Sequence, residues 1–144
     1  MKSHNISSLL LLLSIFSVVF AACKDPAAEC GCPPRKTFDL QYLESNKPNL
    51  IAENPSQTFY APTVTYPDCK AIISECPQPG STMIALIAAD GESKFHTEIN
   101  GEPLTNPFDI TNVRCSSIKE WWLNGLGSIQ ASLDSYKLGC MVPK

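Results

Sequence analysis

The chain has 144 residues, 44% of them apolar and 17% charged, with a formal net charge of −3 at pH 7. That length supports one domain with a modest hydrophobic core. The mildly acidic balance argues against nucleic acid as a partner, because phosphate binding needs clustered Lys and Arg side chains.

Residues 1–21 have the composition of a cleaved signal peptide. Lys2 gives a weakly positive start, residues 9–20 form a short apolar run, and Ala21 is small enough for signal peptidase. We therefore expect a secreted, extracellular protein, whose cysteines are disulfide partners and not metal ligands or catalytic thiols. No later segment approaches the ~20 apolar residues of a membrane-spanning helix, so we expect no transmembrane segment.

Cys23 has three interpretations, and the sequence leaves all of them open. Residues 20–23 resemble a bacterial lipobox, in which case the protein would be a bacterial-type lipoprotein lipidated at Cys23. Otherwise Cys23 is an unpaired thiol, or it links two chains in a disulfide-bonded dimer.

The first mature segment, residues 22–37, is rich in cysteine and proline. We expect an irregular lead-in that disulfide bridges hold in place. Cys30 and Cys32 flank a single glycine, and cysteines this close together rarely reach disulfide geometry with each other. They are expected to form disulfides with two different cysteines elsewhere in the chain.

The next segments alternate between strand and loop patterns. Phe38, Leu40 and Tyr42 alternate with polar residues, which predicts a first strand. Residues 44–63 contain three prolines and predict a long loop, with a short extended piece around residues 58–60. Residues 69–76 predict a second strand, on which the two terminal cysteines face opposite sides.

A β-hairpin is predicted in the middle of the chain. Residues 83–89 are apolar on both faces, as in a strand buried inside a sandwich. Asp90-Gly91 is a strong hairpin signal. The return strand is expected over residues 94–99, with His96 toward water and three side chains facing inward: Phe95, Thr97 and Ile99.

Three more strands are expected in the last third, over residues 108–115, 121–123 and 136–140. The pattern at residues 129–133 is ambiguous and is compatible with one helical turn. Six or seven short strands separated by turn signals predict an all-β fold. We expect residues 38–144 to form a single small, disulfide-bridged antiparallel β-sandwich of immunoglobulin-like size.

The order of the cysteines and a following tryptophan resembles a nematode family of secreted six-cysteine domains whose function is unknown. The resemblance rests on six positions and on the tryptophan at 121 or 122: Cys30, Cys32, Cys69, Cys76, Cys115 and Cys140. It implies a small extracellular β domain with three bridges, and it implies no enzyme activity.

Six cysteines allow fifteen pairings, and sequence alone does not choose among them. Our expectation is a bridge between Cys76 and Cys115, which would join two inner strands. Cys30 and Cys32 would then share Cys69 and Cys140 between them.

A catalytic site is not expected. His96 is the one histidine downstream of the signal peptide, and no Gly-x-Ser-x-Gly motif accompanies it. We interpret His96 as a surface residue, and we expect no enzyme activity, no cofactor and no metal. The acidic residues of the middle region are interpreted as solvent-exposed residues of turns and loops: Asp90, Glu92, Glu98, Glu102 and Asp109.

Trp121 and Trp122 are the candidate binding residues. On a strand, one ring points inward to the core and the other points outward, where it could stack on a sugar or a protein. We therefore predict a binding or structural module whose partner is an extracellular protein or glycan. The alternatives are a small secreted protease inhibitor presenting residues 44–63, and a secreted hydrolase using His96.

Overall fold

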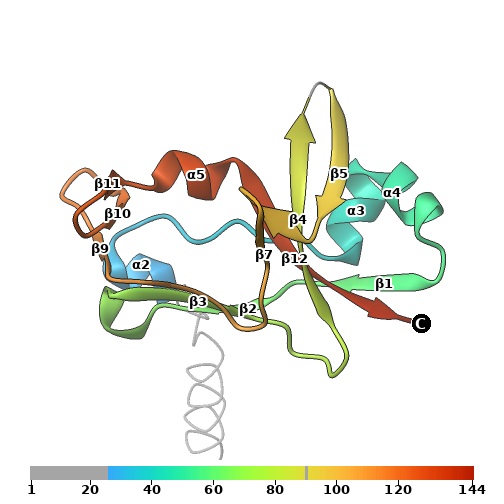
Figure 1. Ribbon diagram of the computed structural model, residues 1–144, viewed down its shortest axis with the longest axis horizontal. Helices are drawn as coiled ribbons and strands as arrows, with labels where there is room; N and C mark the ends of the chain where they lie inside the picture. The colour runs from blue at the N-terminus through green and yellow to red at the C-terminus, as the bar shows by residue number, and fades with distance from the viewer. Residues whose placement is uncertain (1–25, 90) are drawn as a thin grey trace, which may run out of the picture.

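The computed structural model describes residues 26–89 and 91–144; the predicted signal peptide and Cys23 lie outside them. The described chain is mainly β, and the strands of its sheets pair antiparallel (Figure 1). Three disulfides cross-link it. The predicted fold class, a disulfide-bridged chain built on antiparallel sheets, is confirmed.

A four-stranded sheet forms the centre of the molecule, in the order β1-β12-β4-β5. Its strands are β1 (Gln57–Tyr60), β12 (Tyr136–Pro143), β4 (Thr82–Ala89) and β5 (Glu92–His96). Strand β4 is buried on both faces over residues 83–86, because Met83 and Ala85 alternate with Ile84 and Leu86. The prediction of a doubly buried strand over residues 83–89 is wrong for Ala88 and Ala89, which are exposed. The predicted hairpin joins β4 to β5, and Gly91 supplies a positive φ of 79°.

Two helices cover one face of this sheet: α3 (Leu40–Asn46) and α4 (Pro48–Glu53) (Figure 1). The predicted strand at residues 38–42 is therefore wrong. Asp39 caps α3, because its Oδ1 accepts a hydrogen bond from the Tyr42 N–H at 2.8 Å. The buried cluster beneath the helices contains Phe38, Leu43, Leu50, Phe59, Ile84 and Leu86. The predicted loop at residues 44–63 is wrong where it contains α4, whereas the extended piece predicted around residues 58–60 is confirmed as β1.

Short strands cover the other face. A second sheet has the order β2-β3-β8, with β2 (Thr63–Thr65), β3 (Ala71–Glu75) and β8 (Phe108–Thr111); β6 (Glu98–Ile99) and β7 (Glu102–Pro103) form a hairpin beside it. The buried cluster on this side, cluster A, contains Met83, Ala85, Tyr136 and Leu138. Thr97, predicted to face inward, is exposed where the chain passes from β5 to β6.

A third region lies at the other end of the molecule from α3 and α4 (Figure 1). It contains a small sheet of β9 (Val113–Cys115), β10 (Trp121–Leu123) and β11 (Gly127–Ser128), the helices α2 (Pro26–Cys30) and α5 (Gln130–Asp134), and the 3₁₀ turn η2 (Pro67–Cys69). Helix α5 decides the ambiguous segment at residues 129–133 in favour of a helical turn, whereas α2 was not foreseen in the lead-in. The buried cluster here, cluster B, contains Ala27, Cys32, Tyr66, Ile72, Val113, Trp121 and Leu133.

Candidate functional site

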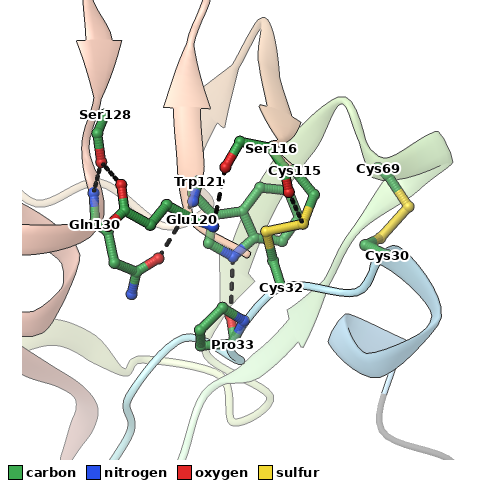
Figure 2. The surroundings of a disulfide bond; sticks show 10 residues. All are labelled: Cys30, Cys32, Pro33, Cys69, Cys115, Ser116, Glu120, Trp121, Ser128 and Gln130. Carbon is green, nitrogen blue, oxygen red and sulfur yellow. Dashed lines mark hydrogen bonds between the residues drawn. A yellow bond between two sulfur atoms is a disulfide. The ribbon is translucent and has the colours of Figure 1, made fainter. Parts of the chain in front are cut away.

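The six cysteines of the described chain form three bridges: Cys30–Cys69, Cys32–Cys115 and Cys76–Cys140. Cys30 and Cys32 have different partners, as expected (Figure 2). The expected bridge between Cys76 and Cys115 is wrong. Cys140 shares a face of β12 with Tyr136 and Leu138, two members of cluster A. Cys76 packs against the same cluster.

The bridges join parts of the chain that lie far apart in the sequence. Cys30–Cys69 links the lead-in to η2, and Cys32–Cys115 links it to the end of β9. Cys76–Cys140 links the end of β3 to the central strand β12. All three are intramolecular, which is compatible with an extracellular protein. Within residues 26–89 and 91–144, no helix has the length and apolar composition to cross a membrane. The expected roles of Cys23 fall outside the described residues.

Trp121 is a core residue. Its side chain is 1% exposed, and its ring stacks on Tyr66 with 5.5 Å between centroids. The indole Nε1–H donates to the Pro33 carbonyl at 2.8 Å, next to the Cys32–Cys115 bridge (Figure 2). Trp121 therefore attaches the lead-in to cluster B, and it is the inward ring of the predicted pair.

Trp122 is half-buried and pairs with Arg114 on β9 and with Ser128 on β11. Its Nε1 is buried, and it has no hydrogen-bond partner in the part of the chain that the structure describes. The ring is thus more covered than a free stacking platform would be. Its role in binding a sugar or a protein stays a prediction.

His96 is exposed on β5, opposite Ala85 of β4. The hydrogen bonds and ion pairs found among the described residues do not involve its side chain. The same residues contain no group of three or more His, Cys, Asp or Glu side chains that could hold a metal ion.

Arg35 is a functional candidate that the sequence analysis missed, because it stands inside a proline-rich segment. It is 5% exposed, and its guanidinium lies over the Tyr136 ring, 4.1 Å from the centroid. Its Nη1 donates to the Leu133 carbonyl, whereas Nε and Nη2 have no partner among the residues described. Burial lowers the pKa of Arg35, and nearby Tyr136, Tyr66 and Asp134 oppose that shift only in part.

A hollow of about 250 Å³, here called the seam pocket, lies where clusters A and B meet. Six half-buried apolar side chains form most of its wall: Ile99, Leu104 and Phe108 beside cluster A, and Ile110, Leu123 and Ile129 beside cluster B. The buried side chains of Leu133 and Tyr136 complete the apolar lining. A mainly apolar lining with a few polar groups is the usual composition of a ligand site.

Local sequence patterns explain how these side chains converge. Phe108 and Ile110 alternate along β8 and so share one face. Ile129 is the N-cap of α5, and Leu133 lies four residues later, where its N–H donates to the Ile129 carbonyl. The β6–β7 hairpin turns at residues 100–101, where both residues have positive φ values of 53° and 80°.

Three polar side chains complete the lining of the seam pocket: Asn100, Glu102 and Ser132. Glu102 is the one charged residue in this lining, and it makes no ion pair with another described residue. The lining of the pocket therefore combines an apolar wall with a single, exposed carboxylate.

A second hollow, of about 390 Å³, lies between the α3–α4 turn and the β4–β5 hairpin. Its lining is mainly polar, and it includes Asn46, Lys47 and Asn49 on one side. Two of its charged groups already neutralise each other, since Lys94 Nζ lies 3.1 Å from Glu92 Oε2. This hollow therefore offers a ligand less apolar surface than the seam pocket.

Comparison with known proteins found no match among protein-family models, curated proteins or solved structures.

Proposed function

We propose that this protein is a secreted, disulfide-bridged binding module that takes a small apolar ligand in the seam pocket. The observation that carries the proposal is the gathering of six half-buried apolar side chains around one opening. Apolar surface left open to water is unfavourable, and its concentration in a concave, polar-rimmed site is typical of ligand binding.

Secretion and the resemblance to nematode six-cysteine domains belong to the same proposal. The disulfides support it, because each of the six cysteines on which the resemblance rests is paired in a bridge. Disulfides of this kind persist in oxidising compartments, to which the predicted signal peptide would direct the chain.

Protease inhibition is the weaker alternative. Such an inhibitor would present a rigid exposed loop, and residues 44–63 were the candidate. That segment instead forms α4 and β1, with Leu50 and Phe59 buried under the helices. We therefore favour ligand binding.

Titration with a neutral apolar probe tests the proposal. Phenethyl alcohol, followed by amide NMR of the exported protein, should shift signals from the pocket lining, such as Phe108 and Leu133. Ser132 is exposed and lines the pocket, so Ser132→Phe should fill the opening and abolish the shifts. The matched control is Ser117→Phe, which places the same ring in the exposed turn between β9 and β10.

A wild-type protein that shows no shifts at millimolar probe would contradict the proposal. So would equal shifts in both variants, because the probe would then be binding outside the seam pocket.

A further inference from the structure

We propose that the ligand of the seam pocket is a small organic amine: an apolar body of about ten non-hydrogen atoms that carries a protonated amino group against Glu102. This inference rests on the proposed function and adds the chemical class of the ligand. It follows from the size, the wall and the charge of the pocket.

Size sets the first limit. An apolar protein cavity of about 150 Å³ stays dry and holds benzene, which has six non-hydrogen atoms. The seam pocket, at about 250 Å³, is larger. In proportion it accommodates about ten such atoms, which corresponds to a single ring with a short chain.

The wall sets the second limit. Eight of the lining residues present apolar or aromatic side chains, and they come from five elements or their connecting segments. A polar body would lose its hydrogen bonds to water without replacing them there. The body of the ligand must therefore be apolar.

Charge sets the third limit. Glu102 follows the hairpin turn on β7, opposite Ile99, and no Lys, Arg or His lines the pocket. Glu98 and Asp109 alternate with the lining residues of β6 and β8 and do not line the pocket, so Glu102 supplies its charge. A cationic head group is attracted to this rim, whereas an anionic one is repelled.

Three probes with the same apolar body separate the contribution of the wall from that of the Glu102 charge. They are phenethylamine, which is cationic, phenethyl alcohol, which is neutral, and hydrocinnamate, which is anionic. We expect the amine to bind about fivefold more tightly than the alcohol, since an ion pair at a solvent-exposed rim gives a modest gain. The anion should bind more weakly than both.

Glu102→Gln keeps the shape of the side chain and removes its charge. In this variant the Kd of phenethylamine should rise about fivefold to that of the alcohol, while the Kd of the alcohol should stay the same. Glu92→Gln, at the exposed tip of the β4–β5 hairpin, is the control and should leave all three Kd values unchanged. Calorimetry at low and at high salt adds a second readout, because salt should weaken only amine binding.

The outcomes separate this inference from the proposed function. If the alcohol binds wild type and Ser132→Phe abolishes its binding, but the amine shows no preference that Glu102→Gln removes, the amine inference is wrong and the proposed function stands. Tighter binding of the anion than of the amine would also overturn the inference. If no probe binds wild type, both fail.

Discussion

The ring of Phe38 lies directly on the backbone of Gly139. A Cβ at position 139 would come closer to this ring than the 3.0 Å that real Cβ atoms respect. The ring cannot easily retreat, because it is 2% exposed and stacks on Phe95 with 5.8 Å between centroids. Gly139 thus lets the helix-covered layer reach the central strand β12.

Gly139→Ala should therefore destabilise the fold. Overpacking of this kind costs about 1–3 kcal/mol, measured as a lower free energy of unfolding in urea. Phe38→Leu should recover part of the loss in the Gly139→Ala background, although it destabilises the wild type. Equal stability of wild type and Gly139→Ala would show that the contact is looser than described.

Arg35→Met should be tolerated better than Arg35→Ala. The guanidinium is buried without a carboxylate partner among the described residues, so its charge adds little stability, whereas its stem fills space beside Tyr136. We expect Arg35→Ala to cost about 2–4 kcal/mol and Arg35→Met less than about 1.5 kcal/mol. Urea unfolding of both variants provides the comparison. A Met variant as unstable as the Ala variant would mean that the charge itself is needed.

Asp134 should contribute a small, acid-sensitive part of the stability. Hydrogen bonds from Lys36 and Gln130 lower the pKa of its carboxyl group. A lowered folded-state pKa stabilises the protein above the unfolded value, near pH 4, and this gain is lost as pH falls through the folded-state pKa.

Because the side chains of Lys36 and Asp134 are 45% and 43% exposed, the gain should be below about 0.5 kcal/mol. Thermal unfolding of wild type and Asp134→Asn from pH 2 to pH 7 measures it. The two Tm curves should differ at neutral pH and converge under acidic conditions. A constant difference across this range would contradict the assignment.

The two adjacent tryptophans should respond differently to replacement by phenylalanine. Trp121→Phe removes the hydrogen bond to Pro33 and part of the stack on Tyr66, and should cost about 1–3 kcal/mol. Trp122→Phe removes a buried N–H that has no partner among the described residues, so it should change stability by less than about 1 kcal/mol. Denaturant midpoints of the two variants give the comparison, and a reversed order would be contrary to it.

Local patterns in the sequence were enough to predict part of this fold. The run at residues 83–89 is apolar on both faces, and its first four residues form the part of β4 that is buried on both faces. Gly91 marks the hairpin because its positive φ suits few other residues. Likewise, Trp121 and Trp122 divide between core and outer face as strand alternation requires.

Other features depend on competing or long-range effects. Residues 38–42 alternate like a strand, but the cap formed by Asp39 favours a helix there. The partner of Cys76 depends on how β12 packs against β3, which local patterns do not specify. The seam pocket was likewise not predictable, although Phe108 and Ile110 show the alternation that builds one of its walls, because its other walls come from distant segments.

The central claim is that an exported chain is held in this fold by three specific bridges. Peptide mapping of protein collected from the culture medium, with free thiols blocked and no reductant, tests it most directly. The account predicts cross-linked peptides for Cys30–Cys69, Cys32–Cys115 and Cys76–Cys140, with a mature N-terminus at Ala22. A peptide linking Cys76 to Cys115, or free thiols at these six positions, would contradict it.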